Sequence, residues 1–301
     1  MTTTLAAPAT ATQVARPRYE GANIRTWIGF KHFMYLVEEA VLDWLREQGH
    51  GARELFHSHG LGVEIVDCSV QLPAVLEVDD EVRAQVTHVT GRRFTVQLVV
   101  RRDDRDVVVL RGKVTVALLV EADAPHRADA PERLAGLAAA DLTEVTGPVE
   151  PRTELPTGPA SLLWSWRAPY FYCHFSDRVQ HSGFVRCLEE VVDRFLADRD
   201  ISVGRMLRER SWIPVVSRAR VRLLAPAHME ETVHTVFTVT DVLRGTMFDG
   251  RMDCFVERDG AFWPVATATI LHGYAISRGP QAGSLAELDP EVCAILLGAD
   301  R

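Results

Sequence analysis

The sequence lacks several features that mark particular classes of protein. It has no surplus of basic residues, because 33 Lys and Arg stand against 41 Asp and Glu, which gives a net charge of −8. This balance disfavours nucleic acids and anionic membranes as partners. No apolar run approaches the roughly 20 residues of a membrane-spanning helix. We therefore expect no nucleic-acid partner and no membrane partner.

Cysteine is also scarce and irregularly placed. The chain has five cysteines, an odd number, and none forms a Cys-x-x-Cys pair. Neither a disulfide framework nor a cysteine-ligated zinc site is indicated, and a reducing cytoplasm is the default location. Residues 1–17 are rich in Ala and Thr and lack the charged-then-apolar order of a signal peptide, so we expect a disordered lead there.

The chain does contain an internal repeat. Residues 33–41 align with residues 184–192 at a shift of 184 − 33 = 151. The same shift, without a gap, matches the pairs Val70/Val221, Leu72/Leu223, Ala74/Ala225, Val82/Val233 and Thr87/Thr238. One register that holds through helix and strands indicates a duplicated domain.

Each repeat is expected to be one long buried helix followed by four antiparallel strands that alternate polar and apolar residues. The helices are expected at 31–48 and 182–197, the second beginning with Ser182 as its N-cap. Residues 49–62 are expected to form a loop, whereas 203–210 form a second helical piece. The helix is the only large apolar partner for each sheet, so the fold class is α+β, with a sheet wrapped around a central helix.

The domain boundaries follow from this pattern and from shifts in composition. The expected segments are a lead at 1–17, a first domain at 18–120, a linker at 121–164, a second domain at 165–275, and a C-terminal tail at 276–301. Residues 131–140 are the candidate for a short helix in the linker, and residues 290–297 are the candidate for one in the tail.

With these features the sequence resembles the hotdog-fold acyl-thioester enzymes, here as a tandem (double) hotdog. The segment His181-Ser182-Gly183, with Glu190 nine residues after the histidine, is similar to the His-Gly-Gly…acid motif of phenylacetate-type and 4-hydroxybenzoyl-coenzyme A thioesterases. The resemblance implies that Glu190 is the nucleophile or general base and that the Gly183 N–H polarises the thioester carbonyl. Ser182 replaces the first Gly of that motif.

The first repeat departs further from the motif. Phe30 stands at the position of His181, and His32 at that of Gly183, while Glu39 is kept. His32, Tyr35 and Glu39 share one helix face, which is either a pocket lining or the polar side of the helix. Whether the first repeat is also active is therefore left open.

Each candidate site residue has a functional and a structural interpretation. A carboxylate on a mostly buried helix suits a general base, and this applies to Glu190 and Glu39, whereas an ion pair of Glu190 with Arg186 is the structural alternative. His181 is a catalytic candidate or a polar loop residue. Asp177, four residues before it, is a candidate acid or a loop residue favoured at a helix start.

The remaining candidates would contact the substrate rather than react with it. They are Gly183, Ser182, Tyr35, Arg186 and Trp27. His57 and His59 suggest a metal site, but the spacing places no third ligand beside them. We therefore predict a polar loop there, no metal, and no cofactor.

The function expected is an enzyme that processes acyl thioesters, with a thioesterase first. The alternatives are a dehydratase or cyclase of polyketide or other secondary metabolism, and a non-catalytic binder of a hydrophobic acyl or aromatic molecule. The expected partner is an acyl-thioester or polyketide-like small molecule, carried by coenzyme A or by an acyl carrier protein. Whether the chain forms a homodimer is left open.

Overall fold

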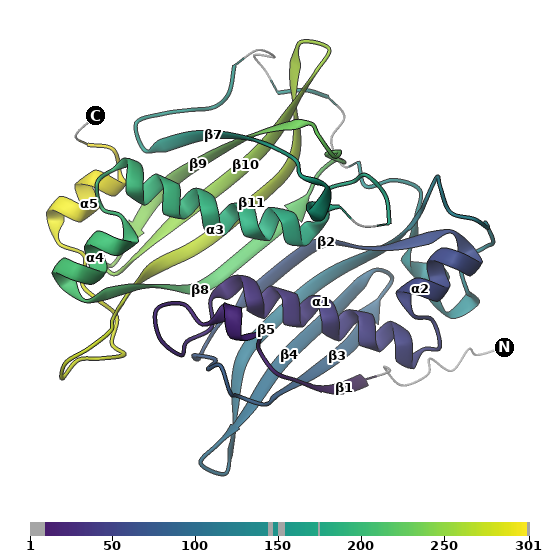
Figure 1. The fold of residues 1–301 in the computed structure, drawn as a ribbon, viewed down its shortest axis with the longest axis horizontal. Coiled ribbons are helices and arrows are strands. Elements are labelled where there is room, and N and C mark those ends of the chain that lie inside the picture. The colour runs from purple at the N-terminus through teal and green to yellow at the C-terminus, as the bar shows by residue number, and fades with distance from the viewer. Residues whose placement is uncertain (1–9, 144–146, 150–153, 174, 300–301) are drawn as a thin grey trace. The chain divides into compact units, whose positions relative to one another are not determined.

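The structure, a computed structural model, describes residues 10–143, 147–149, 154–173 and 175–299. The chain divides into two compact units, one up to Asp141 and one from Leu142 (Figure 1). None of the described helices is long and apolar enough to cross a membrane.

The first unit is a five-stranded antiparallel sheet with one long helix. The helix α1 spans Phe30–Glu47. The strands lie in the order β1-β3-β4-β5-β2. Their bounds are β1 Thr10–Ala15, β2 Leu61–Gln71, β3 Val82–Thr90, β4 Arg93–Arg102 and β5 Arg105–Val120. A two-residue strand, β6 (Ala138–Ala139), pairs in parallel with β5.

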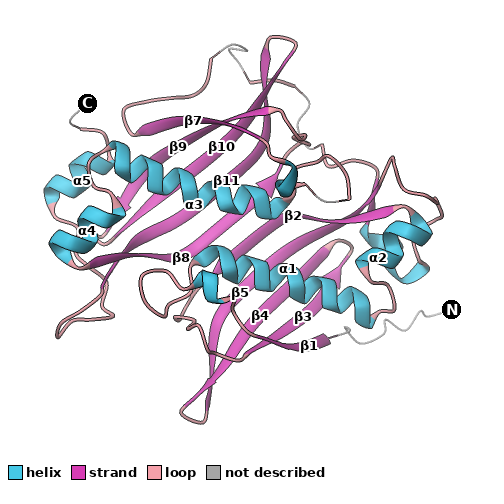
Figure 2. Cartoon of the chain, in the orientation of Figure 1, coloured by secondary structure: helices cyan, strands magenta, loops and turns pink. Residues whose placement is uncertain are grey.

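The second unit repeats this arrangement. The helix α3 spans His181–Asp198, and the strands lie in the order β7-β9-β10-β11-β8. Their bounds are β7 Ser161–Arg167, β8 Trp212–Leu223, β9 Thr232–Leu243, β10 Met247–Arg258 and β11 Ala261–Ile276. Two shorter helices follow the pattern of the sequence, α4 (Val203–Arg210) and α5 (Pro290–Leu296). In Figure 2 each long helix lies across its own sheet.

The 151-residue shift of the sequence recurs in the structure through the long helix of each unit, whereas the last strands, β5 and β11, begin 261 − 105 = 156 residues apart. The two long helices begin 181 − 30 = 151 and end 198 − 47 = 151 residues apart. The short 3₁₀ turns η1 (Tyr19–Gly21) and η4 (Tyr170–Tyr172), which precede them, keep the same shift. The predicted duplication therefore has a backbone counterpart in both units.

The apolar face of each helix packs on its sheet. In α1, Phe33, Val37 and Leu45 are buried at helical spacing, and β3 alternates buried with partly exposed residues as its period of two requires. Each such side chain contributes about 1.5–3 kcal/mol by leaving water. This burial, rather than capping, holds the helix in place, since α1 and α3 have no side-chain cap hydrogen bond at their described starts.

Three expectations from the sequence are wrong. Residues 10–15 of the expected lead form β1, and residues 161–167, mostly within the expected linker, form β7, so each sheet has five strands instead of four. The expected loop at 49–62 contains a helical segment over 52–59, α2 (Ala52–Glu54) followed by the π-helical η2 (Leu55–His59). By contrast, the short helix expected within 131–140 is present, as the 3₁₀ helix η3 (Glu132–Leu137).

Candidate active site

The motif residues lie at the start of α3. The helix begins at His181 with Gln180 as its N-cap, one residue earlier than predicted, so Ser182 lies inside the first turn. Ser182 is buried and has no capping role, which corrects the prediction.

His181 is a buried residue that faces strand β8. Its exposed fraction is 3%, and its Nε2 lies 3.1 Å from the carbonyl oxygen of Val221. A carbonyl only accepts hydrogen bonds, so Nε2 carries the proton in this contact. The contact holds the imidazole against the sheet and fixes its tautomer.

Gly183 does not present its N–H to an open space. The N–H donates to the carbonyl oxygen of Gln180 at 3.0 Å. A Cβ at position 183 would lie 3.3 Å from Tyr172 Cβ and 3.1 Å from Val179 Cγ1. In this conformation, therefore, Gly183 lets the helix approach Tyr172 closely, and its N–H would serve an oxyanion only after the Gln180 bond opens.

The carboxylates of Glu190 and Glu39 were expected to be buried, but both are partly exposed. The Glu190 side chain is 42% exposed and accepts hydrogen bonds from Arg194 at 2.7 and 2.9 Å. Glu39 is 57% exposed, with Arg46 at 3.9 Å. The expectation of buried carboxylates is wrong because both residues lie at the margin of the apolar face. The arginine beside Glu190 is Arg194.

Arg186 and Cys187 occupy the next part of α3. The Arg186 guanidinium lies over the Tyr172 ring, 5.4 Å from its centroid. Cys187 is fully buried, and this burial raises the pKa of its thiol well above the usual range, which disfavours a role as nucleophile and fits a packing residue.

The first-unit candidates form a packed group at the start of α1. His32 is buried, and its ring meets the Tyr35 ring edge-on at 5.3 Å. A Cβ at Gly21 would lie 2.7 Å from His32 Cγ, so this turn lies directly on the histidine. Trp27 is partly buried and makes an isolated bridge with Glu77.

Asp177 is paired with a histidine that the sequence did not single out. Its Oδ1 lies 3.1 Å from Nδ1 of His228, with side-chain exposures of 58% and 40%. The backbone holds the two together, since the Met229 N–H donates to the Asp177 carbonyl at 2.7 Å and Arg178 bridges His228. Asp177 lies in the segment that enters α3. Through Asp177 the pair is thus close in the chain to the motif that begins at His181.

The backbone of His228 is fixed by an ion pair behind it. Its N–H donates to Glu231 Oε2 at 2.7 Å, and Arg258 donates to both Glu231 oxygens at 2.8 and 2.9 Å. Burial raises the pKa of Glu231, but the hydrogen bonds from Arg258 and the His228 N–H outweigh it, and the net pKa is lowered. Glu231 therefore stays ionised and anchors the turn.

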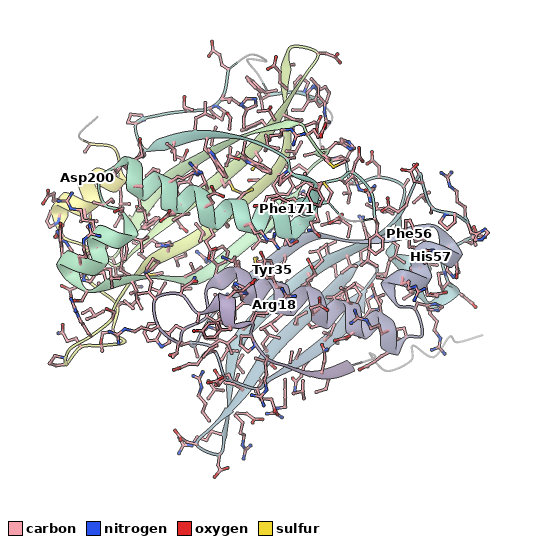
Figure 3. All side chains as sticks on the ribbon, in the orientation of Figure 1. Arg18, Tyr35, Phe56, His57, Phe171 and Asp200 are labelled. Atoms are coloured by element: carbon pink, nitrogen blue, oxygen red, sulfur yellow. The ribbon has the colours of Figure 1, made fainter. Side chains whose placement is uncertain are left out.

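The segment that precedes α3 carries three exposed aromatic side chains. Tyr170 is 75% exposed, Phe171 57% and Phe175 38%. Phe171 stands at the beginning of α3 in Figure 3. Large apolar side chains gathered on one surface are typical of a contact for an apolar ligand or partner.

The first unit has the same scaffold with different reactive groups. By the 151-residue shift Thr26 and Glu77 occupy the positions of Asp177 and His228, and Thr26 Oγ1 donates to Glu77 Oε2 at 2.8 Å. The Glu77 N–H donates to Asp80, which pairs with Arg102. The repeat aligns Asp177 with Thr26 and His228 with Glu77, but it gives no signal that Asp177 and His228 meet.

The comparisons with known proteins agree with this architecture. A family model described as the thioesterase-like superfamily matches residues 164–296, in the second unit. A 12:0-ACP thioesterase from Umbellularia californica has a similar structure, with a TM-score of 0.61 and 10% identity over 88% of this chain and 94% of that one. No curated protein sequence matches the chain.

Two further structures give the same result. An oleoyl thioesterase (putative) from Lactobacillus plantarum has a TM-score of 0.60 and 11% identity, over 88% of this chain and 96% of that one. An acyl-ACP thioesterase from Bacteroides thetaiotaomicron has a TM-score of 0.56 and 10% identity, over 87% and 97%. The chain thus has the α+β tandem hotdog fold of the acyl-thioester enzymes that the sequence resembles.

Proposed function

We propose that this protein is a thioesterase and that its second unit carries out the hydrolysis. The observation that carries the proposal is that the thioesterase-like family model matches residues 164–296, which hold the Asp177–His228 pair. The matching positions of the first unit hold Thr26 and Glu77 instead. The relatives of similar fold support the same assignment, since their names describe thioesterases.

In the proposed reaction His228 is the general base. Asp177 accepts the Nδ1–H of His228, which leaves Nε2 to take a proton from water. The hydroxide attacks the thioester carbonyl, the C–S bond of the tetrahedral intermediate breaks, and the proton on Nε2 passes to the leaving thiolate. The products are a carboxylic acid and a free thiol. The positive end of the α3 dipole, which the Asp177 segment enters, favours the negative charge of the intermediate.

The exposed aromatic residues in the segment before α3 support a proposal for the substrate class. The exposed rings of Tyr170, Phe171 and Phe175 favour an apolar acyl or aromatic group. The names of two similar structures describe thioesterases of acyl chains on ACP. We propose an apolar acyl group on the pantetheine thiol of a carrier protein or of coenzyme A as the substrate.

Glu190 is the second candidate for the base in the same reaction. It has the spacing from His181 that the resemblance implies, but Arg194 holds its carboxylate at 2.7 Å. Both hydrogen bonds from the guanidinium go to Oε1, so that oxygen is already occupied and is not free to accept a proton from water. We therefore rank it below His228, with His181, Gly183 and Arg186 as residues that position the start of α3.

The test is thiol release from a panel of acyl-coenzyme A and acyl-carrier-protein thioesters. His228→Gln and Asp177→Asn should each lower kcat/KM by about 10²–10⁴-fold, the usual worth of a general base. Glu77→Gln and Thr26→Ala, the same positions in the first unit, are the matched controls and should leave the rate unchanged. A loss in Glu190→Gln with a normal rate in His228→Gln would transfer the role to Glu190.

Other outcomes identify the alternatives. Thermal stabilisation by the ligands without thiol release would indicate a binder. A change in the ultraviolet spectrum of a polyketide thioester without thiol release would indicate a cyclase or dehydratase. Either result would overturn the thioesterase proposal.

A further inference from the structure

The segment that follows α1 differs from its copy in the second unit. Both copies contain eight helical residues at the 151-residue shift, Ala52–His59 and Val203–Arg210. The copy in the second unit is an ordinary α-helix, whereas the first unit turns π-helical over Leu55–His59. Single-turn π segments are rare and often mark functional sites.

The π turn places two polar side chains together. In an α-helix, residues five apart point about 140° away from each other. In a π turn the hydrogen bond joins residues five apart, so such residues lie almost above one another. This change of pitch brings His59 over Glu54, at the boundary of α2 and η2. The unusual backbone therefore has a consequence for side chains that the copy in the second unit lacks.

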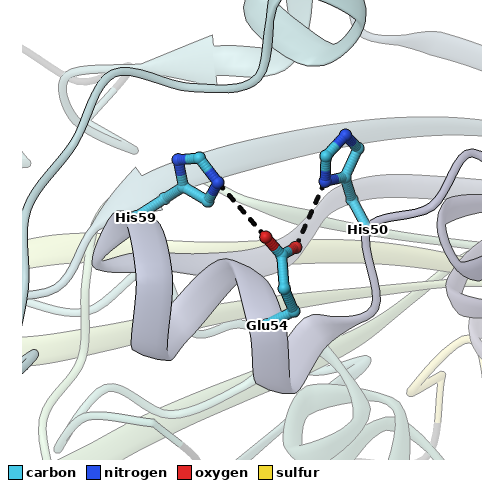
Figure 4. Close-up of side chains that lie close together, drawn as sticks. All are labelled: His50, Glu54 and His59. Atoms are coloured by element: carbon cyan, nitrogen blue, oxygen red, sulfur yellow. Dashed lines mark hydrogen bonds and ion pairs between the residues drawn. The ribbon is translucent and has the colours of Figure 1, made fainter.

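His50, at the other side of the segment, completes the group (Figure 4). Its Nδ1 lies 3.2 Å from one oxygen of Glu54, and Nε2 of His59 lies 3.3 Å from the other oxygen. The three donor atoms are all within 4.8 Å of one another. In a tetrahedral zinc site with bonds of about 2.0–2.1 Å, neighbouring ligand atoms are about 3.3 Å apart.

The tautomer of His59 favours a cation in this group. Its Nδ1 lies 2.8 Å from the carbonyl oxygen of Asp129, which only accepts, so Nδ1 carries a proton. The neutral ring then points the lone pair of Nε2 at a carboxylate oxygen that also only accepts. A second proton or a metal ion must lie between them. An Nδ1–H bound to a backbone carbonyl is also the usual orientation of a histidine that binds metal through Nε2.

We propose that His50 Nδ1, the Glu54 carboxylate and His59 Nε2 bind one Zn²⁺ ion, with water in the fourth position. Two imidazoles and one carboxylate suit this ion, and three protein ligands with a fourth position for water form a known class of zinc site. The sequence-based prediction of no metal did not include His50 and Glu54. His57, which it considered, is exposed and lies outside the group.

The ion would tie together three segments that already meet. The loop after β5 is held to the π turn, because the Glu121 N–H donates to the Gly60 carbonyl at 2.8 Å and the Ala128 N–H donates to that of His59 at 3.3 Å. The site lies beyond the C-terminal end of α1, and α1 is 18 residues, about 27 Å, long. Within the first unit the metal would therefore be a structural clamp, remote from His32.

The second unit provides a natural negative control. The positions of His50, Glu54 and His59 are taken by Ile201, Arg205 and Arg210. Arg205 pairs there with Glu209 and Asp200, and Arg210 with Asp289. Such a set repels a cation, so one ion per chain is expected rather than two.

The experiment uses the full chain without an affinity tag, stripped of metal with a chelator. Titration calorimetry with ZnCl₂ should give one equivalent per chain, Co²⁺ should bind with a tetrahedral visible spectrum, and Mg²⁺ should not compete. His50→Ala, Glu54→Gln and His59→Ala should each weaken binding by about 100-fold or more, beyond the roughly 10–100-fold cost of losing an outer partner. His57→Ala, from the same π turn, should bind as the unchanged chain does.

Zinc should also raise the melting temperature of the unchanged chain and of His57→Ala, but not that of Glu54→Gln, which keeps the shape of the side chain. Less than half an equivalent of bound zinc in the unchanged chain would overturn the proposal, whether or not any variant folds. So would affinity that survives both His50→Ala and His59→Ala. None of these readouts depends on thioester hydrolysis.

Discussion

The two units have a similar backbone arrangement and differ in their side chains at three matched places. At the entry to the long helix, the first unit has Thr26 and Glu77 where the second has Asp177 and His228. The scaffold behind these pairs is the same, since Arg102 and Arg258 each join a carboxylate and a backbone carbonyl. The two units thus have the same arginine–carboxylate contacts but hold different polar pairs with them.

The second difference is that the large residue and the glycine exchange places between the turn and the long helix. In the first unit the turn before the helix provides Gly21 and the helix provides His32, whereas the second unit has Tyr172 in the turn and Gly183 in the helix. One position is large and the other is glycine in both cases, because the turn and helix lie too close for two side chains. The third difference is the π turn with His50, Glu54 and His59 in the first unit only. The proposed thioester hydrolysis therefore belongs to the second unit and the proposed zinc site to the first.

The largest expected effect comes from placing a large side chain in both the turn and the helix of the first unit. Gly21→Tyr places a Cβ 2.7 Å from His32 Cγ and should lower the free energy of unfolding by about 3 kcal/mol, the upper part of the usual cost of overpacking. The double variant Gly21→Tyr with His32→Gly imitates the second unit and should recover at least half of the loss. Urea denaturation measures both. A double variant no more stable than Gly21→Tyr would show that the exchange is not the reason for the glycine.

The next effect concerns a buried histidine in one unit only. His272 of β11 pairs with Val216 of β8. Ile65 occupies the position of Val216 at the 151-residue shift and pairs with Val116 of β5, so Val116 is the structural counterpart of His272. Burial lowers the pKa of His272 from 6.5 to about 4. The folded state thus binds fewer protons than the unfolded state between these values, and the free energy of unfolding should fall by about 2 kcal/mol from pH 6.5 to pH 5.

His272→Val should remove most of that acid loss. It should also stabilise the chain by about 1 kcal/mol at pH 7, because within the described residues His272 Nδ1 is buried without a hydrogen-bond partner. Unfolding curves at pH 5 and pH 7 measure both effects. An unchanged pH dependence in the variant would assign the acid loss to other groups.

A smaller effect should distinguish the two arginines. Arg102→Ala and Arg258→Ala should each cost about 1.5 kcal/mol of stability, because each removes charge-assisted hydrogen bonds from a partly buried carboxylate. Only Arg258→Ala should also slow thioester hydrolysis, by about 10-fold, since its partner Glu231 fixes the backbone of His228. Equal rates of hydrolysis in both variants would show that the Arg258–Glu231 contact to the His228 backbone does not affect the reaction.

The smallest effect is expected for the two exposed carboxylates. Glu39→Gln and Glu190→Gln should each change the free energy of unfolding by less than about 0.5 kcal/mol, because both belong to exposed ion pairs. Thermal unfolding at low and at high salt measures this. A loss above about 1 kcal/mol in Glu190→Gln alone would mean that Arg194 and Glu190 are part of a stronger local network.

Much of the fold could be predicted from periodicity and self-similarity. The ends of both long helices were predicted to within one residue, because a helix with a broad apolar stripe has only one way to bury it. The strands β1 and β7 were missed because they are short and separate from the four main strands of each unit, β1 in an Ala- and Thr-rich stretch and β7 at the end of the linker. The π turn was also missed, since three histidines and a serine between 50 and 59 have no apolar period.

The candidate site was less predictable than the fold. The helix start was found from His181 and Gly183, but the burial of Glu190 was overestimated, because the width of a helix's apolar face depends on how the sheet curves around it. The pairing of Asp177 with His228 joins residues 51 apart through a single backbone bridge. No spacing rule covers such a contact.

The strands β1 and β7 bear on the solubility of the chain. Each lies along β3 or β9 and takes up backbone groups that would otherwise form an open edge. Open edges attract strands of other molecules and lead to aggregation. Both covering strands are short and end just before a proline, at Ala15 and Arg167, with Pro17 and Pro169 beyond them. A proline cannot donate a hydrogen bond to a further strand, so β1 and β7 offer only a short edge for pairing with a strand of another molecule.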